Sequence, residues 1–551
     1  MPLDALITGR IATLAGDAGF GWVEAIGIRD GRVAFAGSAV DLETRADPHT
    51  ERLALEPDEV AIPGLTDAHL HLAQAALATR HVDLSTSLTL GDGLRRIRAA
   101  HEGHLAGDPE AWLEGHGWDP DRWGGWPAAT DLERVAPGRR IALWAHDHHA
   151  LWVSLAALQS AGVSAATTDP SGGIVRRDDA GRPAGVLHDA AARLVTVHIP
   201  LASGDDLASA VLGVGQSLVS LGIVAVHDPG PLAPDPDLAF SFPAYAHLSD
   251  TGRLPVRVHA CLRDDALETA LAGGLRSGEV LGADPAGRAR IGWQKCFADG
   301  SMGSRTARLL EDIEIEPGGI APDDRRRGLW MTEPDVLAAQ VQRAAAGGIA
   351  TQVHAIGDAA VRVALDALTP VAGRSRLMPR VEHVQMLHPA DRARFAAGRV
   401  AASVQPVHLG SDAVVARRLW GSRAEARGYT WGSLARAGAV VAFGTDAPIE
   451  PIDPWPGIAL SVTRVDPRWP EGGPAFGTDE ALTLDRALRA ACVNPAISAG
   501  EFDRGRLVVG HRADLAILPA TALQEPVTPG GALGTVRPAL VMMDGRVVYE
   551  R

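Results

Sequence analysis

The sequence lacks the features that direct a protein to a membrane or to secretion. Across its 551 residues, no apolar run reaches the roughly 18 residues that a membrane-spanning helix needs. The segment 1–10 has neither the basic region nor the apolar region of a signal peptide. The three cysteines lie far apart and suggest no disulfide framework, which favours a reducing compartment. We therefore expect a cytoplasmic protein with no membrane partner.

Positive charge is also in short supply. Lysine is very scarce, arginine carries nearly all of the positive charge, and the formal net charge is -15. Because the basic residues form no cluster along the chain, we expect neither a nucleic acid nor an anionic membrane surface as a partner. The scarcity of lysine makes Lys295 conspicuous.

What the sequence does contain is a repeated alternation of short apolar strands with helical stretches rich in alanine, leucine and arginine. Eight such units are typical of an α/β protein with a (β/α)8 TIM-like barrel. In that fold the chemistry lies at the carboxyl ends of the strands. The expected barrel strands are 61–65, 222–226, 256–261, 291–297, 350–353, 380–382, 400–404 and 440–443.

Both ends of the chain are predicted to form short strands instead. Asp30-Gly31 and Asp544-Gly545 each predict a tight hairpin turn, and we expect the two ends to pair in one small β-sandwich. The stretch between the first two barrel strands is too long for a loop, so we interpret it as an inserted α/β subdomain with a hairpin over 173–185. The expected division is 1–61 and 504–551 for the sandwich, 76–200 for the insert, 62–75 for barrel strand 1, and 201–503 for strands 2 to 8.

The clearest chemical motif is the pair His69 and His71 after an apolar run. Alternate residues of a strand share a face, so two imidazoles spaced in this way can hold one divalent ion of the zinc or iron type. Asp67 can support them through a hydrogen bond. A solvated His-x-His at a strand end explains this motif equally well when it is considered alone.

Other metal-competent side chains occupy the ends of the remaining predicted strands. Random placement would not put so many of them at one end of the strands, so their distribution favours a metal centre at the barrel mouth. They are His227 and Asp228 on strand 2, His259 on strand 3, Lys295 on strand 4, His354 on strand 5, His383 on strand 6, Gln405 and His408 on strand 7, and Asp446 on strand 8.

This ordered set resembles the amidohydrolase superfamily of metal-dependent hydrolases. Within it, the chain looks most like the YtcJ-like group (amidohydrolase family 3), which includes N-substituted formamide deformylase. The resemblance covers nearly the whole chain. It rests on the segments 62–72, 295–307, 354–360, 380–385, 403–408, 444–449 and 505–515, and on 149–154 and 170–174 in the insert.

The resemblance implies one or two divalent metal ions, with zinc the best fit, held by His69, His71, His354, His383 and Asp446. It also implies a carbamate on Lys295 that bridges two metals; the alternative is an unmodified lysine paired with Asp299 or Asp446. Asp446 would act as general base and then general acid while metal-activated hydroxide attacks a carbonyl carbon. Alternatively, Asp446 is a helix N-cap after strand 8.

The implied function is hydrolysis of a non-peptide C–N bond: an amide, N-acyl or N-formyl bond. A mononuclear deaminase, another cyclic-amide hydrolase of the superfamily and a non-catalytic metal-binding scaffold are the alternatives. The segment after His354 offers no glutamate, which disfavours the deaminase. The many tryptophans favour a small hydrophobic or aromatic amide as substrate. The sequence leaves the oligomeric state undecided, with a homodimer as one alternative. Candidate substrate contacts are Gln405, His408, Trp118, Trp123 and Arg305. The alternative for Gln405 and His408 is hydrogen bonding at the barrel rim, for Trp118 and Trp123 it is core packing, and for Arg305 it is ion pairing.

Overall fold

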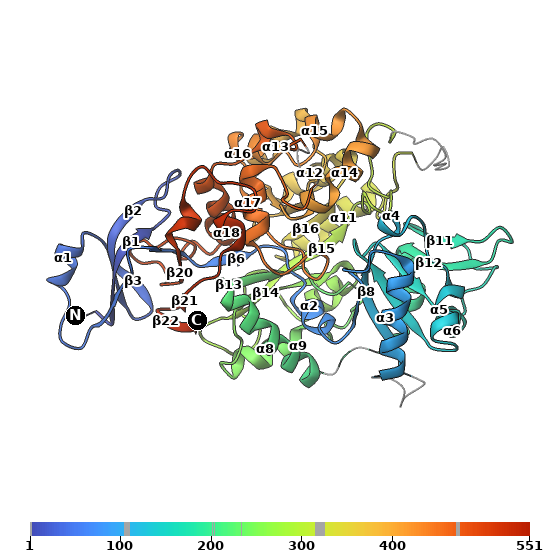
Figure 1. Cartoon of the computed structure of the whole chain (residues 1–551), viewed down its shortest axis with the longest axis horizontal. Helices are drawn as coiled ribbons and strands as arrows, with labels where there is room; N and C mark the ends of the chain where they lie inside the picture. The colour runs from blue at the N-terminus through green and yellow to red at the C-terminus, as the bar shows by residue number, and fades with distance from the viewer. Residues whose placement is uncertain are drawn as a thin grey trace.

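The barrel forms the centre of the molecule in the computed structural model, which describes residues 3–103, 111–200, 202, 204–232, 234–313, 326–469 and 474–551. Its eight parallel strands are ordered β19-β18-β17-β16-β15-β14-β13-β6 (Figure 1). The backbone N–H of Ala68 donates to the carbonyl oxygen of Phe443 at 2.8 Å, which brings the first and last strands together. The strands are β6 (Leu65–Asp67), β13 (Ile223–Asp228), β14 (Arg257–Arg263), β15 (Ala289–Phe297), β16 (Thr351–Ala355), β17 (Arg380–His383), β18 (Ala401–Val404) and β19 (Val441–Phe443).

Helices cover the outside of this sheet because each carries one apolar stripe. In α12 (Asp358–Leu368), Val361, Leu365 and Leu368 are buried at the spacing of one helical face. The strands are covered on both sides and are therefore buried along almost their whole length. Other helices of this layer are α8 (Gly204–Ser220), α9 (Phe242–Asp250), α11 (Pro334–Ala346), α14 (His408–Trp420), α17 (Trp455–Thr463) and α18 (Leu484–Ser498).

The first barrel strand differs from the prediction. The apolar run expected to form one strand over 61–65 is divided between two sheets: β5 (Glu59–Pro63) pairs with the C-terminal strand β20 (Leu515–Pro519), and β6 begins at Leu65. Gly64 lies at the crossing. A Cβ there would lie 2.8 Å from a methyl carbon of Val224, so only glycine lets the chain pass this close to strand β13. Hydrophobicity alone could not indicate where one sheet ends and the next begins.

Strands from both ends of the chain join in one sheet, as predicted. Its order is β22-β21-β20-β5-β1-β2-β3, with β4 also paired to β1, and the blue and red strands lie together in Figure 1. Asp30 and Gly31, like Asp544 and Gly545, all have positive φ, as a tight two-residue hairpin turn requires. The remaining strands are β1 (Ala5–Ala12), β2 (Trp22–Arg29), β3 (Arg32–Gly37), β4 (Glu51–Ala54), β21 (Leu540–Met543) and β22 (Arg546–Glu550).

The segment between β6 and β13 forms a third sheet, ordered β11-β12-β10-β9-β8-β7, on the side of the barrel away from the terminal sheet (Figure 1). Trp118 and Trp152 are fully buried and pack on helices α3 (Leu90–Gly103) and α5 (Ala129–Val135) in its core. The predicted hairpin over 173–185 is present as β11 and β12. The strands are β7 (Val82–Asp83), β8 (Leu113–Trp118), β9 (Ile141–Ala145), β10 (Ala150–Val153), β11 (Gly173–Arg177) and β12 (Pro183–Asp189).

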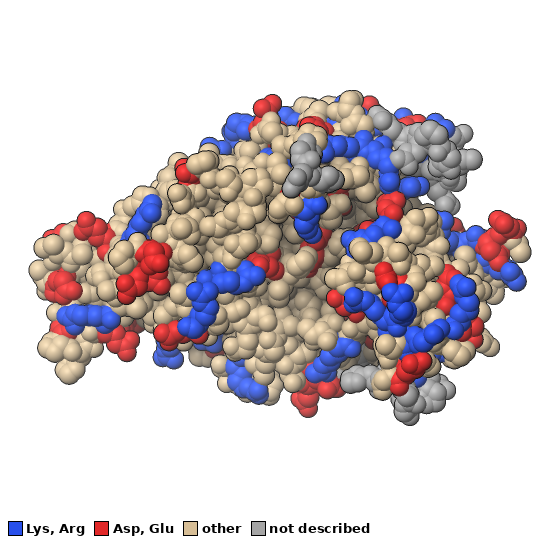
Figure 2. Space-filling view, viewed as in Figure 1, with Lys and Arg blue, Asp and Glu red and all other residues tan. Residues whose placement is uncertain are grey.

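Charged side chains of both signs are intermingled on the face of the molecule shown in Figure 2. On the face in Figure 2, acidic and basic groups alternate over both the barrel and the insert, separated by uncharged areas. Among the residues that the structure describes, no helix is both long enough and apolar enough to cross a membrane.

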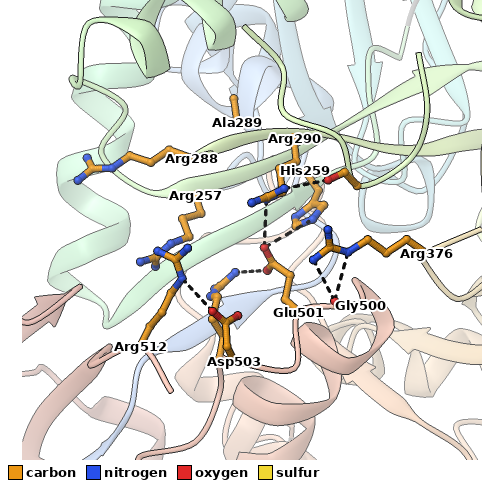
Figure 3. A network of polar contacts seen from close by, with 12 residues as sticks. Arg257, His259, Arg288, Ala289, Arg290, Arg376, Gly500, Glu501, Asp503 and Arg512 are labelled. Atoms are coloured by element: carbon orange, nitrogen blue, oxygen red, sulfur yellow. Dashed lines mark hydrogen bonds and ion pairs between the residues drawn. The ribbon is translucent and has the colours of Figure 1, made fainter. Parts of the chain in front are cut away.

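A buried polar network attaches the C-terminal segment to the amino end of the barrel (Figure 3). Glu501, 8% exposed, forms an ion pair with Arg504, and its Oε1 lies 3.5 Å from Arg290 Nε and 4.0 Å from His259 Nε2. Burial alone would raise the pKa of Glu501, but Arg504, His259 and Arg290 lower it to about 2. The ionised carboxylate is therefore held by the buried guanidinium of Arg504 and the partly buried guanidinium of Arg290.

We expect Glu501→Gln to lower the free energy of unfolding at pH 7 by about 3–5 kcal/mol, because buried guanidinium groups lose their counter-charge. The folded pKa lies below the ordinary 4.5, so this stabilisation is present above pH 4.5 and is lost as the pH falls toward 2. Denaturant unfolding at several pH values would measure both effects.

The matched control is Glu268→Gln. Glu268 pairs with Arg343 at 2.8 Å, but its side chain is 70% exposed, so the change should cost less than about 1 kcal/mol. Equal effects of the two substitutions would show that the Glu501 network does not stabilise the attachment.

Candidate metal centre

The side chains predicted to bind metal converge at the carboxyl ends of the barrel strands. His69 and His71 follow β6, His354 lies in β16, His383 ends β17 and Asp446 follows β19; all five are buried. His69, His383 and Asp446 each offer a ligand atom within 4.8 Å of the others. The ring centroids of His354 and His383 lie 4.5 Å apart, and those of His69 and His71 lie 5.5 Å apart.

Each of these four histidines has one ring nitrogen engaged by an oxygen acceptor. Such a bond fixes the ring and leaves the other nitrogen available to a metal, as is usual for metal-binding histidines. The bonds are His69 Nδ1 to Glu382 Oε2 at 2.6 Å, His71 Nδ1 to Gly230 O at 2.8 Å, His354 Nε2 to Gly300 O at 3.2 Å and His383 Nδ1 to Gln405 Oε1 at 2.8 Å.

The donor set fits a divalent cation. Within the described part of the chain, His69 Nε2 and Asp446 Oδ1 are buried without a hydrogen-bond partner, although they lie 3.4 Å apart. His71 Nε2 lies 3.5 Å from the same carboxylate oxygen. Burial lowers the pKa of all four histidines, which favours the neutral form that binds metal. A cation at this point would satisfy both unpartnered atoms.

Asp446 is held in an uncommon backbone conformation. Its φ is 63°, and its backbone N–H donates to His69 O at 2.6 Å. The carboxylate of Asp67 accepts from Thr445 Oγ1 at 2.6 Å and from the backbone N–H of His69 at 3.0 Å, so it links the ends of the first and last strands. The alternative role of Asp446 as a helix N-cap is wrong, because the next helix, α17, begins at Trp455 with Pro454 as its N-cap.

Lys295 lies in β15 beside the ligands and is only 2% exposed. Burial lowers its pKa to about 8, although Glu382 and Asp446 oppose the shift. Its Nζ lies 5.1 Å from the ring centroid of Phe297. The alternative partner Asp299 is already engaged, because its carboxylate accepts from the backbone N–H groups of Arg308, Ile356 and Gly357.

A cavity of about 520 Å³ opens from the ligands toward the insert. Of the predicted substrate contacts, His408 lines it, and His408 Nε2 lies 3.4 Å from Asp446 Oδ2. Trp118 adjoins it, but its side chain is fully buried in the core of the insert. Gln405, Trp123 and Arg305 are not among its lining residues. Gln405 binds His383 from behind, Trp123 Nε1 donates to Ser87 O within the insert, and Arg305 is exposed.

The loop between β9 and β10 forms part of the cavity wall, through contacts that the sequence could not reveal. Its Asp147 carboxylate accepts from the Ser301 hydroxyl at 2.5 Å, and His146 lies 3.2 Å from Glu450 Oε1, so the loop is attached to the barrel at two points. His149 Nδ1 bonds to Asp189 at 2.5 Å, and its ring lies 5.0 Å from that of His354. Adjacent histidines were visible in the sequence, but their partners lie far away along the chain.

Comparisons with known proteins match almost all of the chain. The model of a family described as "Amidohydrolase family" matches residues 58–549. Three curated relatives are the protein LONG AFTER FAR-RED 3 of Arabidopsis thaliana, the putative amidohydrolase YtcJ of Bacillus subtilis and the N-substituted formamide deformylase of Arthrobacter pascens. The Arabidopsis protein is 30% identical over 95% of this chain and 88% of its own length. The Bacillus protein is 30% identical over 96% of both chains. The Arthrobacter protein is 27% identical over 99% of this chain and 98% of its own length.

Solved structures show the same fold. Two uncharacterized metal-dependent hydrolases, from Pyrococcus horikoshii and Pyrococcus furiosus, superpose with TM-scores of 0.71 and 0.69 at 23% and 25% identity. Each alignment covers 95% of this chain, and 98% and 100% of the respective structure. The predicted fold class and the predicted resemblance are both confirmed.

Proposed function

Because the chain belongs to the amidohydrolase family, we propose that it is a metal-dependent hydrolase of a non-peptide C–N bond, either an amide, an N-acyl or an N-formyl bond. The observation that carries the proposal is the convergence of His69, His71 and His383 on Asp446, with His354 beside His383 and one ring nitrogen of each histidine already engaged. The similarity to the N-substituted formamide deformylase of Arthrobacter pascens supports the type of bond.

The residues that would hold one or two divalent ions are His69, His71, His354, His383 and Asp446. Imidazole and carboxylate ligands suit zinc best. A bound ion would supply a Lewis acid for the scissile carbonyl and would make a water molecule acidic enough to attack near neutral pH.

Asp446 is the proton carrier in this proposal. Its carboxylate lies within 3.5 Å of ring nitrogens of His69, His71 and His408, so it borders both the ligands and the cavity. It would accept the proton of the attacking water and return it to the leaving nitrogen. Lys295 would carry a carbamate, whose two oxygens share one negative charge and can join two cations, on the side of the barrel opposite to β19.

The cavity walls indicate the class of substrate. The aromatic residues Trp126, Trp144, Trp469 and Phe297 line it, together with several aliphatic side chains. Many charged groups of the wall already have partners within the protein, as in the pairs Arg468–Asp466 at 2.7 Å and His146–Glu450 at 3.2 Å. A small amide with a hydrophobic or aromatic substituent fits these surroundings best.

The test incubates the zinc-loaded protein with a panel of N-formyl and N-acyl arylamines and measures the free amine that hydrolysis releases. We expect turnover of at least one member, its loss when a chelator removes the metal, and its return on addition of zinc. Release of ammonia from amino-substituted heterocycles, without hydrolysis of any amide, would favour a deaminase. Turnover that is unchanged in the metal-free protein would overturn the proposal.

A further inference from the structure

The interior of the barrel beneath the ligands is unusually polar. Side chains inside such barrels are dominated by bulky branched apolar residues. Here His227, His259, Gln352, Arg380 and Glu382, contributed by β13, β14, β16 and β17, are each no more than 1% exposed. Polar groups buried so deeply cost free energy unless they are paired, so their arrangement calls for a specific role.

Arg380 is fixed from several sides. Its Nη1 donates to His227 Nδ1 at 2.9 Å, its Nη2 donates to Gln352 Oε1, and its guanidinium carbon lies 3.8 Å from the ring centroid of Trp293. Its Nε lies 2.9 Å from Glu382 Oε1, which forms an ion pair in which both side chains are 0% exposed. The guanidinium therefore balances the charge of Glu382 where water has no access.

The other carboxylate oxygen of Glu382 points to the metal centre. Oε2 lies 2.6 Å from His69 Nδ1, and neither side chain is exposed. A carboxylate can only accept this hydrogen bond, so the proton of a neutral His69 must lie on Nδ1. Nε2 then carries a free lone pair, and it is this nitrogen that faces Asp446 Oδ1 at 3.4 Å.

We propose that Glu382, held by Arg380, is a positioning residue that fixes the ring orientation and tautomer of the metal ligand His69. The proposal rests on the metal centre proposed above. A purely structural pair would affect the stability of the metal-free protein only. A positioning pair also sets the affinity for the metal, because the carboxylate strengthens the imidazole as a ligand.

The experiment measures the dissociation constant of zinc by competition with a chromogenic chelator. We expect Glu382→Gln to weaken zinc binding by about 10- to 100-fold, since the amide is uncharged and can also donate to Nδ1, which would place the proton on Nε2. The matched control is Asp189→Asn, which makes the same change at the His149–Asp189 pair, joined at 2.5 Å. Zinc affinity of this control should stay within about threefold of the wild-type value.

Folding is tested separately, because Glu382→Gln leaves Arg380 as an unpaired buried cation. The double variant Glu382→Gln, Arg380→Met removes both charges and should unfold closer to the wild-type temperature than the single variant does. It should nevertheless bind zinc as weakly as Glu382→Gln. Thermal unfolding of the metal-free proteins checks the first expectation, and the chelator competition checks the second.

The outcomes separate this inference from the proposed function. Wild-type zinc affinity in both folded variants would overturn the positioning role, as would loss of the fold in both, which would make the pair structural. Failure of the wild-type protein itself to bind zinc would instead overturn the metal centre on which the inference rests.

Discussion

We expect Asp446→Asn to lower turnover by at least about a hundredfold, while the protein stays folded and retains most of its metal. The amide keeps an oxygen where Oδ1 and Oδ2 lie, close to His69, His71 and His408. It cannot accept the proton of the attacking water. The backbone conformation of Asp446, with φ of 63°, is also compatible with asparagine, which tolerates the left-handed region.

The measurement compares the turnover number, the metal content and the thermal unfolding of Asp446→Asn with those of Asp412→Asn. Asp412 is a second cavity carboxylate, which accepts from the hydroxyl of Tyr429 at 2.8 Å and from Gln385 Nε2 at 3.1 Å. Its replacement should cost clearly less turnover, because it faces no ligand. A nearly normal rate in metal-loaded Asp446→Asn would exclude Asp446 as the proton carrier.

Lys295→Ala should lose one or both metal ions and most of the activity. If Lys295 carries a carbamate, the substitution removes the bridging oxygens and their negative charge together. Acetate or bicarbonate at high concentration should restore part of the activity by entering the vacated space. Lys295→Arg should show no such rescue, because the guanidinium fills the space and stays cationic.

The carbamate can also be observed directly. Lys295 is the only lysine in the sequence, so protein incubated with 13C-labelled bicarbonate should give one side-chain carbamate resonance that is missing in Lys295→Ala. Metal analysis and activity complete the comparison. Full metal content and a normal rate in Lys295→Ala would show that the lysine is not a bridge and would favour a mononuclear centre.

The convergence of the candidate metal ligands could be predicted because a barrel converts chain order into spatial proximity. All of its strands are parallel, so residues such as His71, His354 and Asp446 meet once each is recognised at the carboxyl end of a strand. Glu382 could not be recognised in the same way, because its contact with His69 spans 313 residues and crosses the barrel interior. No local pattern distinguishes it from an ordinary strand residue.

The predicted substrate contacts show the same limit. Trp118 and Trp123 follow one another closely in the chain, yet Trp118 is fully buried in the core of the insert next to the cavity, whereas Trp123 packs against that core and is only partly buried. Gln405 ends a barrel strand as expected, but its side chain holds His383 and does not reach the cavity. The direction of each side chain depends on neighbours from other elements, which the sequence does not identify.

By itself, the sequence determined the barrel, the pairing of the two ends and the group of candidate metal ligands, because strand periodicity, turn chemistry and ligand type are local properties. Only the tertiary structure decided that the segment 59–63 joins the terminal sheet and the segment 65–67 joins the barrel, with Gly64 allowing the chain to pass from one sheet to the other. It also decided which oxygen engages each histidine and how the insert closes over the ligands. These depend on contacts between distant segments, whose free energy is realised only when the whole chain is packed.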